Sequence, residues 1–71
     1  MDAVRYRIVV AGQLGPRYSG AFDGMTVEPL DENTAIVGQI TDQAHLQGVL
    51  ERIAGLGLRL VSVTGEEGRA A

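Results

Sequence analysis

One stretch of this chain has the apolar periodicity of a long helix, and it limits the folds open to the rest. Apolar side chains recur at steps of three and four residues over 42–55, as in an amphipathic helix with one buried face. The stripe consists of Leu46, Val49, Leu50, Ile53 and Leu56. Thr41 is expected to cap the first turn, which Asp42 opens, and Gly55 and Gly57 are expected to end the helix. A single long helix must therefore cover any sheet that the other segments build.

The segment Val4–Val10 has the alternation of a β-strand. Its β-branched and aromatic residues fall on one face, and Arg5 and Arg7 fall on the other. Three further strands are expected, over residues 25–30, 34–40 and 58–63. The first two of these form a predicted hairpin, in which Pro29 indicates that its strand lies at a sheet edge. The pattern predicts a four-stranded antiparallel sheet.

The connection between the first and second strands decides the topology. It is too long for a tight hairpin, and Pro16 suits the start of a helix, so we expect one or two helical turns over residues 16–22. The chain then follows the ferredoxin-like split βαβ plan of the α+β class, with its first helix nearly lost. A βββαβ meander is the alternative.

The length of the chain bounds its organisation. Its 71 residues are enough for one domain, which we expect to span residues 1–64 and to be followed by a flexible polar tail at 65–71. One core of this size rarely supplies more than about 3–5 kcal/mol, and short domains usually gain stability from disulfides, a metal or association. The sequence has no cysteine and one histidine, so association is favoured.

The two faces of the expected sheet differ in polarity. The face toward the helix would be apolar, whereas the opposite face would have an aliphatic centre with a charged rim, as interfaces do. The residues expected at this interface are Arg5, Arg7, Val9, Val37, Arg59, Val61 and Val63. We expect this face to bury against a second copy of the chain, since two-fold dimers are the commonest assembly. An exposed face whose valines only satisfy strand propensity, and a small-molecule platform, are the alternatives.

Few side chains offer catalytic chemistry. His45 is the one residue of the type that titrates near neutrality, and it lies at the margin of the helical stripe. A general base there would need a partner such as Asp42 or Ser62, so we favour a solvated histidine near the helix start. Without cysteine, thiolate metal sites and a cysteine nucleophile are excluded. We expect no catalytic residue, no metal site and no cofactor.

The segment between the first two strands is the least explained by folding. It carries Arg17, Tyr18, Phe22 and Asp23 between glycines, on a loop of the kind that often holds functional groups. These four residues are a candidate ligand or partner site, with Arg17 as the contact for an anion or a partner. The alternative, which we favour, is that Tyr18 and Phe22 fill the end of the core that the missing helix leaves uncovered.

Charge and hydropathy argue against nucleic acid and membrane as partners. The net charge is −3, and the third strand has no aromatic residue on which a base could stack. No apolar run approaches the roughly 18 residues of a membrane span, and no signal peptide is recognisable. We expect a cytoplasmic chain that binds neither nucleic acid nor membranes.

Two ordered motifs resemble a known group of proteins. Residues 12–18 follow the pattern G-x-L-x-P-R-aromatic, and residues 42–50 follow D-Q-A-x-L-x-G-[LV]-L. Over residues 4–63 the chain is similar to a group of very short actinobacterial proteins that share these motifs. This resemblance implies a standalone cytoplasmic chain, and it brings no assigned activity and no catalytic residue.

A second, weaker resemblance is to ACT domains, which are amino-acid-sensing modules with βαββαβ order. It rests on Gly15 and Pro16 after the first strand and on the helix and strand over residues 46–63. The resemblance implies binding of a small effector near a full first helix. This chain departs from the ACT pattern there, because the segment is too short for such a helix.

These observations lead to three expectations for function. The first is a small non-enzymatic interaction module that is a homodimer through the exposed sheet face and binds a protein partner. The second is a regulatory domain that binds a small molecule, at the dimer seam or at the loop of residues 12–24. The third is a small enzyme whose site is shared between chains.

Overall fold

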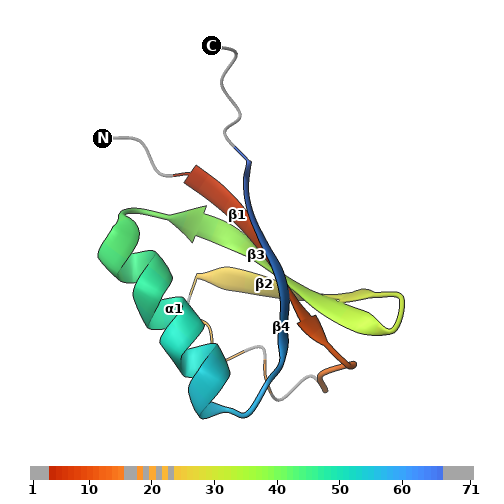
Figure 1. The fold of residues 1–71 in the computed structure, drawn as a ribbon. Coiled ribbons are helices and arrows are strands. Elements are labelled where there is room, and N and C mark those ends of the chain that lie inside the picture. The colour runs from red at the N-terminus through yellow and green to blue at the C-terminus, as the bar shows by residue number, and fades with distance from the viewer. Residues whose placement is uncertain (1–3, 16–17, 19, 21, 23, 67–71) are drawn as a thin grey trace.

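A computed structural model describes residues 4–15, 18, 20, 22 and 24–66 of the chain. Four strands form one antiparallel sheet: β1 (Val4–Ala11), β2 (Met25–Leu30), β3 (Asn33–Ile40) and β4 (Leu60–Glu66). The helix α1 (Gln43–Gly55) packs on one side of the sheet (Figure 1). We call this the helix side and the opposite side the outer face. The expected α+β class is confirmed.

The order of strands in the sheet is β2-β3-β1-β4. Because β1 pairs antiparallel with both β3 and β4, those two strands run parallel with β1 between them, and α1 connects them. This arrangement is the split βαβ unit of the predicted ferredoxin-like plan. A meander, which would keep the strands in chain order, is not what the sheet shows.

The connection from β1 to β2 differs from a full βαβ unit. In its described part, Tyr18 and Gly20 lie in 3₁₀ conformation, and the Tyr18 N–H donates to the Gly15 carbonyl at 3.1 Å. The other residues of the predicted helical turn lie outside the described residues, except Phe22. The elements that the structure describes therefore follow the order βββαβ, with the sheet of the split plan.

The core lies between α1 and the central strands β1 and β3. Ile8 of β1 is paired with Ile36 of β3, and both side chains are fully buried. They pack with other buried apolar residues, namely Val10, Phe22, Met25, Ile40 and Ile53. Phe22 thus fills part of the core from the β1–β2 connection, which confirms the alternative that we favoured for its ring.

Thr34 fixes the beginning of that connection. It is buried on β3, and its hydroxyl donates to the Gly12 carbonyl at 2.8 Å while accepting from the Leu14 N–H at 3.0 Å. A buried hydroxyl with both roles satisfied costs little and holds the two backbone groups in place. Leu14 is thereby positioned to pack against the core.

The end of α1 is a Schellman motif. Gly57 has a φ of +76°, its N–H donates to the Ala54 carbonyl, and the Leu58 N–H donates to the Ile53 carbonyl. Leu58 and Ile53 also pack in the same apolar cluster, the contact that usually accompanies this motif. The glycine signal in the sequence therefore located the helix end correctly.

The last strand runs further than the sequence predicted. It covers residues 60–66 instead of 58–63, so Gly65 and Glu66 belong to β4 and not to a tail. Gly65 lies opposite Tyr6, and a Cβ on this glycine would be 3.2 Å from the Tyr6 ring. An aromatic ring covering a glycine on the neighbouring strand stabilises pairing that the glycine alone would weaken.

A pair of glycine substitutions tests the C-terminal cap of α1. Gly57→Ala should lower the free energy of unfolding by about 1 kcal/mol, because an L-residue is strained at positive φ. Gly48→Ala, in the exposed middle of α1 where the new methyl group meets nothing within 4 Å, should raise it by about 0.5–1 kcal/mol. Urea denaturation of both variants measures the difference, and equal effects would contradict the cap assignment.

Candidate functional site

The outer face keeps four of the residues predicted for an interface. Arg7 lies opposite Val37 in the sheet register, Val9 lies opposite Ala35, and Arg5 lies opposite Gln39. Val9 and Val37, however, are only 7% and 2% exposed. Both belong to central strands, with a neighbouring strand on each side. The exposed aliphatic centre predicted for this face is therefore wrong at Val9 and Val37.

The face predicted for Val63 is also wrong, and the cause is a β-bulge. The register of β1 with β4 shifts between Val9, which lies opposite Ser62, and Val10, which lies opposite Leu60. The shift leaves Val61 as an extra residue and moves every later side chain of β4 to the other face. Val63 lies opposite Ile8 and is consequently on the helix side.

Exposed apolar side chains gather instead along β4. Leu60, Val61 and Val63 are 45%, 52% and 36% exposed. We call these three residues the apolar edge. β4 is the last strand in the sheet order, so its free side pairs with no strand of the described sheet. Figure 1 shows β4 crossing the front of the molecule with no element over it.

Leu56 extends the apolar edge toward the helix. It is the C-cap residue of α1, and its side chain is 41% exposed although it belongs to the apolar stripe. In the sequence, Leu56 belongs to the stripe expected to be buried, because periodicity shows which face a residue takes but not how far a neighbouring element extends over it. The shortage of cover on a four-stranded sheet with one helix was the signal that could have identified the exposed apolar residues.

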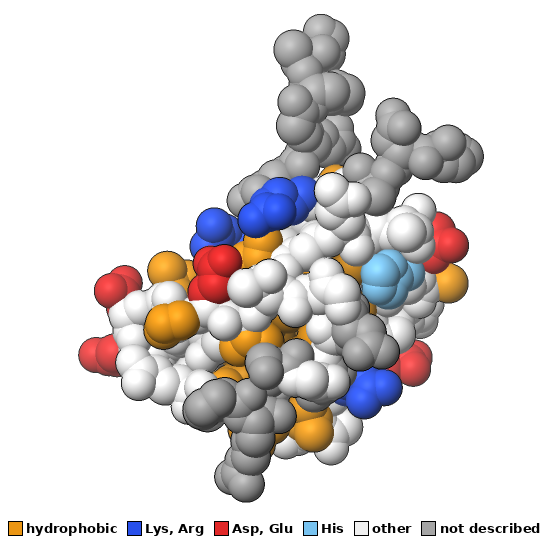
Figure 2. All heavy atoms as spheres, turned by 180° about the vertical axis from the view of Figure 1, so that it is seen from behind, with side chains coloured by type: hydrophobic (Ala, Val, Ile, Leu, Met, Phe, Trp, Pro, Cys, Tyr) orange, Lys and Arg blue, Asp and Glu red, His pale blue; other side chains and the backbone are white. Residues whose placement is uncertain are grey.

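The opposite side of the molecule carries both charged and apolar side chains. Figure 2, seen from behind, shows arginine side chains gathered near one edge beside an acidic side chain, with further acidic groups at the far end. Arg5 and Arg7 each have an interaction partner within the chain. Arg59 is exposed directly before β4, where its carbonyl accepts from the Ala11 N–H at 2.8 Å.

The four candidate residues of the loop 12–24 do not form one site among the described residues. Phe22 is buried in the core, so its ring is not on the surface for a ligand. Tyr18 is half-buried and has a partner within the chain. The other two candidates, Arg17 and Asp23, lie outside the described residues.

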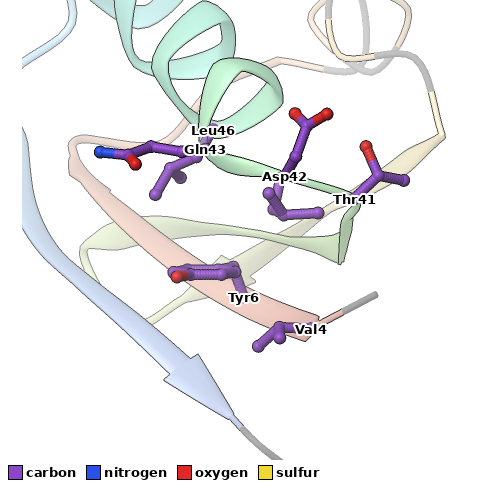
Figure 3. A pocket seen from close by; sticks show the side chains of 7 residues that line it. Val4, Tyr6, Thr41, Asp42, Gln43 and Leu46 are labelled. Atoms are coloured by element: carbon purple, nitrogen blue, oxygen red, sulfur yellow. The ribbon is translucent and has the colours of Figure 1, made fainter. Parts of the chain in front are cut away.

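A hollow of about 360 Å³ opens on the helix side, where the first turn of α1 meets the start of β1. Figure 3 shows Val4 and Tyr6 rising from β1 below Leu46 and Gln43 of the helix. Ile40, Thr41 and Asp42 complete its lining. The hollow has an apolar floor and a polar rim, and the sequence analysis did not foresee it.

Asp42, which lines this hollow, and His45 stabilise the start of the helix. Asp42 is the N-cap, in place of the predicted Thr41, and its carboxylate accepts from the His45 N–H at 2.8 Å. The His45 ring makes a second hydrogen bond at the helix start, in which its Nδ1 accepts from the Thr41 N–H at 3.2 Å. Ser62, once a candidate partner of His45, lies on the outer face, so these two side chains are not brought together.

A second hollow, of about 400 Å³, lies on α1 between Gly48 and Leu56, and neither hollow is lined by Tyr18 or Arg59. No group of three potential metal ligands forms among the described residues. Within the same part of the chain, no helix has the length and hydropathy to cross a membrane.

Substitution of the N-cap tests the arrangement at the start of α1. Asp42→Ala should lower the free energy of unfolding by about 1 kcal/mol, because the His45 N–H loses its acceptor. Asp42→Asn retains a capping oxygen and should stay close to the unsubstituted chain. Thermal and urea unfolding measure both, and an unchanged Asp42→Ala variant would contradict the cap.

Comparison with known proteins places this fold in a family. Residues 5–64 match the model of a domain of unknown function (DUF8691), and the chain belongs to this family. No curated protein and no solved structure matches the chain.

Proposed function

We propose that this member of the DUF8691 family is a small non-enzymatic interaction module that acts as a homodimer and binds a protein partner. The observation that carries the proposal is the apolar edge. Leu60, Val61 and Val63 are exposed on one strand, while Ile8, Val9 and Val10 of β1 and the apolar residues of β3 are buried. Contiguous apolar surface with polar surroundings is typical of protein–protein contacts.

The stability of small domains supports the same proposal. A domain of 71 residues has a thin margin of stability, and it lacks cysteines that could form a disulfide. Association would remove apolar side chains from water, which stabilises the complex by about 25 cal/mol for each Å² of apolar surface buried. A second copy of the chain is always available as a partner, because its concentration equals that of the chain itself, and this favours a homodimer.

We further infer that the family includes the short actinobacterial proteins that the chain resembles. The matched residues 5–64 contain both motifs on which that resemblance rests. The cytoplasm, which the resemblance implies, is the compartment in which we propose that the module acts. Protein is the class of partner that the apolar edge favours over nucleic acid, given the net charge of −3.

A second candidate function is the binding of a small molecule. The hollow beside Tyr6 favours it, because its volume of about 360 Å³ suits a small ligand and its apolar floor has the polar rim typical of such sites. Tyr6 and Leu46 would contact the apolar part of the ligand, and Gln43 would contact its polar part. This site differs from the one that the likeness to ACT domains implied.

The homodimer is tested by the mass of the chain in solution. Light scattering over a dilution series should give twice the chain mass down to the low micromolar range, with dissociation on further dilution. The mass should change little with added salt if apolar contacts dominate, because salt screens only charged interactions. A monomer at every concentration would contradict the proposed homodimer.

A further inference from the structure

We infer that two copies of this chain join edge to edge through β4, antiparallel and about a two-fold axis near Val63, so that the two four-stranded sheets continue into one. The inference rests on the proposed homodimer and names its interface. It replaces the outer face, whose central aliphatic residues are already buried within one chain.

The two edges of the sheet differ in their capacity to pair. β2 contains Pro29, which has no N–H to donate, and this is a common way of blocking an edge. β4 contains no proline, and from Ser62 to Glu66 it pairs with β1 in regular register beyond the bulge. Its free side therefore presents backbone donors and acceptors of the kind that another strand can satisfy.

The charges at the ends of β4 select a second copy and an antiparallel direction. Arg59 stands directly before the strand, and Glu66 is its last residue. Antiparallel pairing centred near Val63 brings the start of each β4 to the end of the other, so that position 59 lies one residue from the position opposite 66. In-register parallel pairing would instead bring like ends, with like charges, together. Opposite charges on facing strands stabilise pairing and like charges oppose it. The strand is thus complementary to itself.

The same register brings Val63 of the two copies together. Residues directly opposite each other in an antiparallel pair point to the same face, so Val63 of each copy would meet Val63 of the other on the helix side. Both α1 helices then lie on one side of the combined sheet. Leu60 of each copy lies three residues from this centre, also on the helix side, where it is 45% exposed in the single chain.

A single-cysteine experiment tests this pairing in the full chain. The natural sequence has no cysteine, so Val63→Cys introduces the only thiol. Opposed residues in an antiparallel pair have Cα atoms about 4.5–5.5 Å apart, within the range of a disulfide. Mild oxidation should convert most Val63→Cys chains to a covalent dimer on a denaturing gel. Thr26→Cys, exposed on the β2 edge, is the matched control and should remain mostly monomeric.

A charge substitution gives an independent readout that leaves the core untouched. Val63→Lys places two like charges opposite each other and should raise the dissociation constant of the dimer by about tenfold or more. Thr26→Lys makes the same change on the outer face and should leave the constant within about twofold. Far-UV circular dichroism at matched concentrations verifies that both variants keep the fold.

The outcomes separate this inference from the proposed function. Efficient cross-linking through residue 63 together with a weakened Val63→Lys dimer supports the inference. A dimer that Val63→Lys leaves intact, and that cross-links no better through residue 63 than through residue 26, overturns the β4 interface while the homodimer stands. A chain that is monomeric throughout overturns both.

Discussion

The structure depends on one constraint: a helix of 13 residues has to cover a sheet of four strands. The core consequently forms where α1 crosses the central strands, around Ile8, Ile36 and Ile53. Phe22 and Leu14 contribute from the β1–β2 connection, in part of the space that a first helix occupies in a full βαβ unit. Neither α1 nor the β1–β2 connection covers β4, and for this reason apolar residues of β4 are exposed.

A bulge and a glycine in β4 decide which of its residues are exposed on which side. The extra residue at Val61 moves Val63 to the helix side, next to Ile8, although α1 does not extend far enough to bury it. Gly65 lies opposite the Tyr6 ring, so the strand continues to Glu66. Together these features give an open edge that pairs regularly with β1 from Ser62 to Glu66 and carries exposed apolar side chains at Leu60, Val61 and Val63.

The sequence predicted the elements better than their surfaces. The stripe from Leu46 to Ile53 and the glycine at position 57 located α1 to within one residue, because helix periodicity and the Schellman motif are local signals. The alternation in β1 and the long connection from β1 to β2 are also visible in the sequence, and together they predicted the split order of the strands. The N-cap was misplaced by one residue, since Thr41 and Asp42 can both accept from the helix start.

The residues of the candidate site were harder to predict, for physical reasons. A bulge leaves no mark in the pattern of apolar and polar residues. The face on which Val63 lies therefore depends on how β4 pairs with β1, which the sequence pattern does not show. The burial of Val9 and Val37 and the hollow beside Tyr6 depend on how elements that are distant in the sequence pack together. These are properties of tertiary arrangement, which a single sequence specifies only indirectly.

Amide hydrogen exchange at two concentrations is the measurement that tests the central claim most directly. If the uncovered β4 edge is where a second copy pairs, amides on the free side of β4 should exchange readily in dilute solution. They should then become protected as the mass doubles, while amides of β1 and β3 are protected at both concentrations. A dimer that forms without any gain of protection in β4 would contradict the account.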